Sequence, residues 1–204
     1  MDIKELGNIP FDLSVLSSVF PKLASISNKA MELEKTGQII RLKKGLYVVS
    51  PSVSGTLLSD SLIANHIYGP SYISMETALR HYGMIPERVR AVRSMTTKHT
   101  RTFENAVGRY EYIGCSKNVF PIGIQMMAEG GISYLIASPE KALYDILMSQ
   151  TTTDLRFNHV LRIYLEDNLR LDMEAFHRLD REVLIACREA GKKKELIDNL
   201  LKLI

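Results

Sequence analysis

The sequence is poor in cysteine and has no long hydrophobic run. Its 204 residues include two cysteines, Cys115 and Cys187, which are too few for a disulfide framework or a four-thiolate zinc site. We expect both to be small buried apolar side chains. No apolar run approaches the ~18 residues that cross a bilayer, and the first residues lack the basic-then-apolar order of a signal peptide. These absences predict a cytoplasmic protein without a membrane partner.

The motifs of common catalytic and cofactor sites are also missing. The histidines lack ligand spacing to one another and to cysteine, so no metal site is expected. There is no phosphate-cradling Gly-rich loop and no Gly-x-Ser-x-Gly elbow. Glu140, Lys141 and Asp145 could imitate a nuclease site, but charges at this spacing on a helix usually form an exposed or interfacial ion pair. We therefore predict no cofactor and no catalytic residue.

What remains is the composition of a globular protein with an uneven charge. The hydrophobic fraction of 46% and charged fraction of 24% exclude disordered and collagen-like classes. Residues 21–50 hold six Lys/Arg against two Glu, which is +4, and residues 80–109 hold seven against two, which is +5. Clustered Lys/Arg side chains are typical of phosphate-binding surfaces, although a charge run is more often a solvated face.

Two short helices are predicted near the N-terminus. Apolar residues at three- and four-residue steps indicate a helix over 13–20, with Asp12 available as its N-cap. A second helix is predicted over 27–37, where Ser27 or Asn28 can cap the start and a glycine can close the end. Its inward side chains, Ala30 and Leu33, leave Asn28, Lys29, Glu32 and Lys35 on the outer face.

A hairpin with a basic tip is predicted directly after these helices. Two β-branched and aromatic runs over 38–49 flank the sequence Lys43-Lys44-Gly45, and we expect both tip lysines to bury nothing. Helix, helix and basic hairpin is the order of a winged helix, in which the second helix enters the major groove and the wing follows the phosphate backbone. A small structural helix–hairpin cap is the alternative.

A Ser- and Pro-rich stretch over 51–55 marks the predicted domain boundary. It divides the chain into an N-terminal winged helix-turn-helix over 1–52 and a C-terminal domain over 53–204. The fold class is α+β, and the second domain should contain a small, mostly antiparallel sheet followed by a helical tail from about residue 155.

The elements expected in the second domain follow from periodicity and turn residues. They are helices over 57–66, 74–82 and 139–147, and strands over 89–96, 101–105, 108–113, 122–127 and 132–137. Ser138 and Pro139 mark the start of the third helix, and Gly130-Gly131 forms a hairpin turn. In the first strand, alternation would bring Arg88, Arg90 and Arg93 near one surface and extend a DNA contact.

Three motifs together resemble the AbiEi antitoxin family of type IV toxin–antitoxin systems. They are the hairpin segment Ile40–Val48, the segment Tyr72–Pro86 and the segment Ala137–Asp145. Their order and spacing span roughly residues 39–147. The N-terminal part is shorter than the family pattern, and its middle helix is poorly marked.

The resemblance implies a bacterial antitoxin that represses its own operon. Its winged helix would bind double-stranded DNA upstream of that operon, its second domain would provide antitoxicity, and a nucleotidyltransferase-like toxin would be its functional partner without a stable complex. Carried onto this chain, the expected DNA-binding residues are Asn28, Lys29, Lys35, Arg41, Lys43 and Lys44. The alternative is a protein-interaction module that binds a partner through its C-terminal domain, with a structural hairpin.

Overall fold

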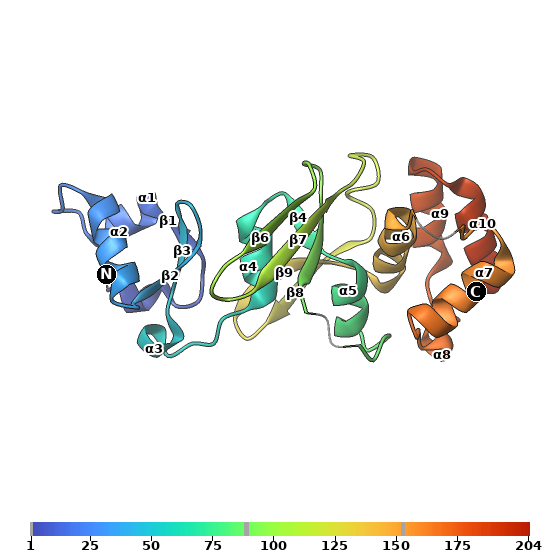
Figure 1. The fold of residues 1–204 in the computed structure, drawn as a ribbon, viewed down its shortest axis with the longest axis horizontal. Coiled ribbons are helices and arrows are strands. Elements are labelled where there is room, and N and C mark those ends of the chain that lie inside the picture. The colour runs from blue at the N-terminus through green and yellow to red at the C-terminus, as the bar shows by residue number, and fades with distance from the viewer. Residues whose placement is uncertain (1, 88–89, 152–153) are drawn as a thin grey trace.

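Two sheets of unequal size organise the chain, and a group of helices follows them (Figure 1). The computed structural model describes residues 2–87, 90–151 and 154–204. Within these residues the protein is mixed α+β, as predicted. The smaller sheet lies at one end of an elongated molecule, the larger sheet in the middle and the C-terminal helices at the other end (Figure 1).

The N-terminal sheet has three strands among the described residues, in the order β1-β3-β2. A 3₁₀ turn precedes the first strand, and two helices separate that strand from the hairpin. The elements are η1 (Ile3–Leu6), β1 (Phe11–Asp12), α1 (Leu13–Val19), α2 (Ile26–Lys35), β2 (Ile39–Lys43) and β3 (Leu46–Val49). The hairpin agrees with the prediction, whereas β1 was not predicted. It places Phe11 opposite Tyr47 in an antiparallel pair with β3.

The starts of the two N-terminal helices differ in how well their sequence marks them. Asp12 caps α1 as predicted, because its carboxylate accepts from two backbone N–H groups of the first turn at 2.9 and 3.1 Å. The predicted cap of α2 is wrong, since the helix begins at Ile26 with Ser25 in the cap position. Ser27 and Asn28 therefore lie inside the first turn.

The hairpin of β2 and β3 has two buried faces. Ile39, Tyr47 and Val49 belong to the N-terminal core. Leu42 and Val48, which are 2% and 0% exposed, belong instead to the core of the larger sheet. The hairpin therefore contributes to both cores, so packing is continuous across the predicted domain boundary.

The larger sheet has six strands among the described residues, in the order β6-β7-β5-β4-β9-β8 (Figure 1). The pairs β6–β7, β5–β4 and β9–β8 are antiparallel, and the pairs β7–β5 and β4–β9 are parallel. The sheet is thus mixed, with antiparallel pairing in the majority. Its strands are β4 (Ser71–Ile73), β5 (Val92–Thr96), β6 (Arg101–Glu104), β7 (Arg109–Gly114), β8 (Ile124–Glu129) and β9 (Ile132–Ala137).

Helices pack on this sheet and then continue to the C-terminus. The helices on the sheet are α4 (Asp60–Ile67), α5 (Met75–His81) and α6 (Pro139–Ser149), whereas the short helix α3 (Pro51–Ser54) packs against η1. The tail is helical as predicted and consists of α7 (Asn158–Ile163), a π-helical turn η2 (Tyr164–Asn168), α8 (Met173–Phe176), α9 (Arg181–Ala190) and α10 (Lys194–Leu203). α3 replaces the irregular linker expected at this point by a single helical turn.

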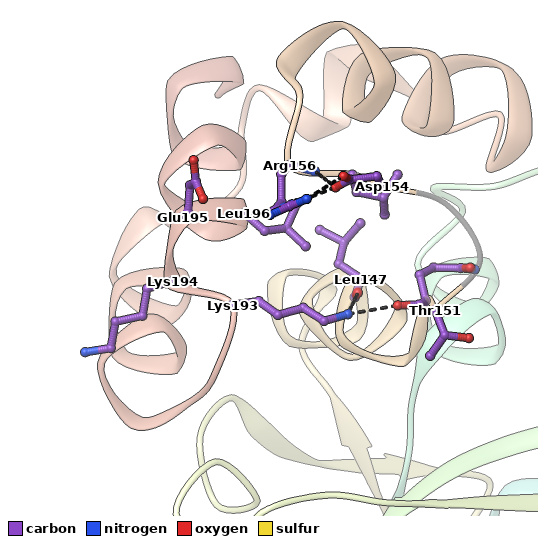
Figure 2. Close-up of a pocket in the computed structure, with 10 residues that line it drawn as sticks. Leu147, Thr151, Asp154, Arg156, Lys193, Lys194, Glu195 and Leu196 are labelled. Atoms are coloured by element: carbon purple, nitrogen blue, oxygen red, sulfur yellow. Dashed lines mark hydrogen bonds and ion pairs between the residues drawn. The ribbon is translucent and has the colours of Figure 1, made fainter.

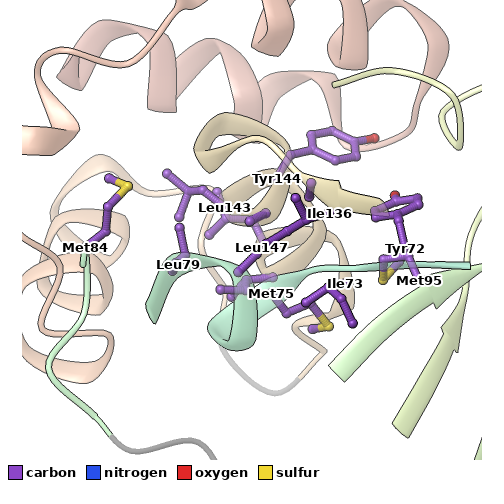
Figure 3. Packing of buried hydrophobic residues seen from close by; sticks show 14 of the residues in the cluster. Tyr72, Ile73, Met75, Leu79, Met84, Met95, Ile136, Leu143, Tyr144 and Leu147 are labelled. Atoms are coloured by element: carbon purple, nitrogen blue, oxygen red, sulfur yellow. The ribbon is translucent and has the colours of Figure 1, made fainter. Parts of the chain in front are cut away.

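α6 is the central element of the main core. Its start agrees with the prediction, because the Ser138 hydroxyl accepts from the backbone N–H of Lys141, the third residue of the helix, and Pro139 occupies the first position. Leu143 and Leu147 are fully buried, and they point toward side chains of the sheet and of α5 (Figure 3). The tail helix α9 packs against α6 as well, so α6 lies between the sheet region and the tail.

Candidate nucleic-acid interface

α2 has one buried face and one exposed face, as its pattern predicts. Ala30 and Leu33 are 1% and 2% exposed in the N-terminal core. Asn28 and Lys35 are exposed on the outside of the helix. Because Asn28 lies in the first turn, its amide is presented at the N-terminal end of α2, the end that reads base edges in many DNA-binding helices.

Two of the predicted DNA-binding cations pair with carboxylates. Lys29 Nζ lies 2.9 Å from Glu32 Oε1, and the Arg41 guanidinium lies 2.5 Å from Glu34 Oε2. Ion pairs at such partly exposed positions contribute little free energy. Phosphate can therefore replace either carboxylate, but in the free protein the charges of both cations are compensated.

The two lysines at the hairpin tip have different surroundings. Lys44 is exposed, whereas Lys43 Nζ donates to the Ile67 carbonyl oxygen at 2.6 Å. That oxygen is at the C-terminal end of α4, where unpaired carbonyls and the helix dipole attract a cation. Partial burial lowers the pKa of Lys43, and the nearby cations Lys98 and Arg101 lower it further. The prediction that both tip lysines bury nothing is wrong for Lys43.

The arginines of the second basic segment do not line one strand. β5 begins after Arg90, which is exposed in the connection before it. Arg93 lies on the strand and binds Glu76 at 2.7 Å and Glu111 at 3.4 Å. The expected alignment of arginines along one strand is therefore wrong for Arg90 and Arg93, and Arg88 lies outside the described residues.

The charged trio of α6 is buried, contrary to the expectation of an exposed or interfacial pair. Lys141 and Asp145 are 0% and 1% exposed, with Nζ and Oδ1 2.7 Å apart. The other carboxylate oxygen accepts from the Tyr72 hydroxyl at 3.0 Å and the Ser74 hydroxyl at 2.7 Å. Burial raises the pKa of Asp145, and these donors oppose that effect by favouring its charged form.

The trio of Glu140, Lys141 and Asp145 connects α6 to neighbouring parts of the fold. Glu140 is 8% exposed and accepts from the backbone N–H of Asp180 at 3.0 Å, next to the start of α9. All three members of the trio are thus enclosed: Glu140 and Asp145 are hydrogen-bonded to neighbouring elements, and Lys141 is paired with Asp145. The sequence did carry a signal, since residues 142–147 are apolar on every side of Asp145, and a helix that is apolar all round is buried.

The cysteines are not activated nucleophiles. Cys187 is fully buried, as predicted, while Cys115 is half-buried. Burial raises the pKa of each thiol to about 11. A reactive cysteine needs a lowered pKa, so neither environment favours thiolate chemistry.

A cavity of about 550 Å³ lies between the end of α6 and the start of α10 (Figure 2). Asp154 and Arg156 pair across its rim at 2.7 Å. Lys193 Nζ reaches the end of α6 and donates to the Gln150 carbonyl oxygen at 2.8 Å. The Lys193 contact links the end of α6 to the start of α10. Over residues 2–87, 90–151 and 154–204, no group of three or more His, Cys, Asp or Glu side chains could hold a metal ion.

No protein-family model matches the chain, and no curated protein matches it. In the part of the chain that the structure describes, every helix is too short or too polar to span a bilayer. The segments Tyr72–Pro86 and Ala137–Asp145 meet in the fold, because the hydroxyls of Tyr72 and Ser74 donate to Asp145. The two segments thus share one buried cluster.

Proposed function

We propose that the protein is a sequence-specific repressor that binds double-stranded DNA through an N-terminal winged helix. The observation that carries the proposal is the pairing of β1 with β3. It gives the order of a helical turn, a strand, two helices and a hairpin, with the three strands arranged β1-β3-β2. The alternative of a small structural helix–hairpin cap does not need the additional strand β1. The three-stranded sheet of a winged helix does contain such a strand.

In this proposal α2 enters the major groove. The Asn28 amide can both donate to and accept from an adenine edge, which makes it the candidate for sequence discrimination. Lys35 and Lys44 are exposed and would contact phosphates. Lys29 and Arg41 would join them by exchanging their glutamates for the DNA backbone.

The biological role follows from the AbiEi resemblance and is part of the same proposal. The protein would act in the bacterial cytoplasm as the antitoxin of a type IV system and repress its own operon. It would not be an enzyme, and its functional partner would be a nucleotidyltransferase-like toxin that it does not bind stably. The second domain would provide antitoxicity.

Fluorescence anisotropy tests DNA recognition directly. The full chain is titrated into the duplex upstream of its own gene and into a scrambled duplex, each at low and physiological salt. A preference for the upstream duplex that persists at physiological salt supports a specific repressor. Equal, salt-sensitive binding to both duplexes, or no binding, contradicts the proposal.

A protein-interaction module is the second candidate, and the surroundings of the hairpin favour it. Leu42 and Val48 pack in the main core and Lys43 caps α4, so the hairpin has a structural role whether or not DNA binds. This candidate predicts a stable complex with the product of the adjacent gene. Co-purification through gel filtration, together with the absence of any duplex preference, would favour it over the repressor.

A further inference from the structure

Three cations from separate segments lie near one another where the hairpin meets the larger sheet. Lys43 ends β2, Lys98 lies between β5 and β6, and Arg101 begins β6. Lys43 Nζ donates to the Ile67 carbonyl at 2.6 Å, and Lys98 Nζ donates to the Gly69 carbonyl at 2.5 Å. Because these two carbonyls are two residues apart, both ammonium groups lie at the same end of α4. Lys98 Nζ lies 5.1 Å from the centroid of the Tyr68 ring, and that ring packs against the Phe103 ring, which the Arg101 guanidinium covers.

These three charges are not neutralised by carboxylates. No ion pair of Lys43, Lys98 or Arg101 occurs among the residues that the structure describes. This distinguishes them from Lys29 and Arg93, which both bind glutamate. A carbonyl oxygen orients an ammonium group but leaves its charge in place. Each ammonium has three N–H donors and the guanidinium has five, so donors remain for an anion.

We propose that Lys43, Lys98 and Arg101 form a second phosphate-binding site, which holds the backbone of the duplex whose groove α2 enters. The inference rests on the proposed function and adds the larger sheet to the DNA-binding surface. Gathering three like charges without a counter-ion is unfavourable in the free protein. A phosphate between them removes that repulsion and gains charge-assisted hydrogen bonds.

A purely structural role accounts for only part of this cluster. Lys43 does cap the end of α4, and Lys98 binds the Gly69 carbonyl just beyond it, but these roles need a donor and not three adjacent charges. The Arg101 side chain donates no hydrogen bond within the described chain, and its guanidinium lies over the Phe103 ring, 4.9 Å from the centroid. Arg101 is exposed, so it is available to an anion from solution.

The test removes charge while keeping the capping donor. In the double variant Lys98→Gln/Arg101→Gln, the glutamine amide can still donate to the Gly69 carbonyl. Affinities for the upstream and scrambled duplexes should fall by the same factor, and the slope of log K against log salt should become shallower by about two. Arg101→Gln alone should change the slope by about one. Because Arg101 caps nothing, this variant remains informative if the double variant is unstable.

The matched control is Lys192→Gln/Lys202→Gln, which removes two charges from the region of α9 and α10 at the opposite end of the molecule (Figure 1). Its salt slope should equal that of the wild type. An unchanged slope in the Lys98 and Arg101 variants, with upstream preference intact, overturns the second site alone. An equal loss in the control assigns the effect to net charge and also overturns the site. If the wild type binds neither duplex, the proposed function fails as well.

Discussion

The two basic segments of the chain, 21–50 and 80–109, differ in what their cations contact. In the second segment Arg80 donates to two backbone carbonyls, while Arg93 and Arg109 bind glutamates. Glutamates therefore compensate part of its +5 charge, at Arg93 and Arg109, while Lys98 and Arg101 have no ion pair among the described residues. The first segment keeps exposed lysines on α2 and at the hairpin tip. A charge run thus predicts a basic surface only where folding brings no acidic partner.

The partners of Arg93 come from elements that its own segment does not reveal. β5 pairs with β7 in parallel, with Arg93 directly opposite Glu111. Glu76 approaches from α5. Both contacts depend on sheet order and helix placement, so local alternation could not predict that this arginine would be compensated.

The largest expected effect concerns the fully buried charge pair, which is the extreme case of compensation. Asp145→Ala leaves the Lys141 ammonium without its carboxylate, and we expect it to lower the free energy of unfolding by about 3–5 kcal/mol. Urea denaturation followed by circular dichroism measures this loss. The double variant Lys141→Met/Asp145→Leu should recover much of it, because no lone charge then remains. A loss below about 1 kcal/mol for Asp145→Ala would contradict this account of the pair.

The next effect tests the exposed face of the first segment. If Asn28 reads a base edge as proposed, Asn28→Ala should reduce discrimination between upstream and scrambled duplexes by about 1–3 kcal/mol, because that contact is lost. Lys35→Ala should instead lower the affinity for both duplexes by the same factor, since it would remove the proposed phosphate contact. Competition anisotropy at physiological salt separates the two outcomes. If Asn28→Ala, like Lys35→Ala, lowered the affinity for both duplexes equally, Asn28 would not be a base-reading residue.

A smaller effect is expected for the compensated arginine. Arg93→Gln breaks a partly exposed network with Glu76 and Glu111, and it should lower the free energy of unfolding by about 1 kcal/mol. DNA affinity and its salt dependence should not change. Thermal unfolding and anisotropy on the same preparation measure both properties. A shallower salt slope would show that Arg93 exchanges its glutamates for phosphate.

The smallest effect is expected for the neighbouring exposed arginine. Arg90→Gln should change the free energy of unfolding by less than about 0.5 kcal/mol, as surface substitutions usually do. It should also leave the salt slope of DNA binding at the wild-type value. A slope reduced by about one would show that this part of the second segment reaches the backbone, and the contrast between the two segments would then be weaker.

Locally encoded elements of the fold were predictable. Asp12 and Ser138 mark helix starts through their caps, and Gly130-Gly131 takes the positive φ values of 58° and 81° that its two-residue turn requires. The short strands β1 and β4 were missed because two or three residues show no periodicity. β4 exists through its partners, as in the pairing of Ile73 with Ile136.

Part of the candidate site could likewise be predicted from the sequence, and part depends on tertiary packing. The exposed side chains of α2 follow from helical spacing, and the structure agrees with the prediction there. The contact of Lys43 with Ile67 could not be predicted, because it joins residues far apart along the chain. The same holds for Lys98, whose approach to Gly69 depends on how β4 and β5 pair. Periodicity identifies exposed faces, but only tertiary packing shows which cations are adjacent.

The hairpin with two buried faces also has a mechanical consequence. Rotating the N-terminal unit against the larger sheet would pull Leu42 and Val48 out of the main core, at roughly 1.5–3 kcal/mol for each side chain. We therefore expect the N-terminal unit and the larger sheet to rotate together as one rigid body. A duplex held by α2 at one end would fix the direction in which the helical tail points at the other.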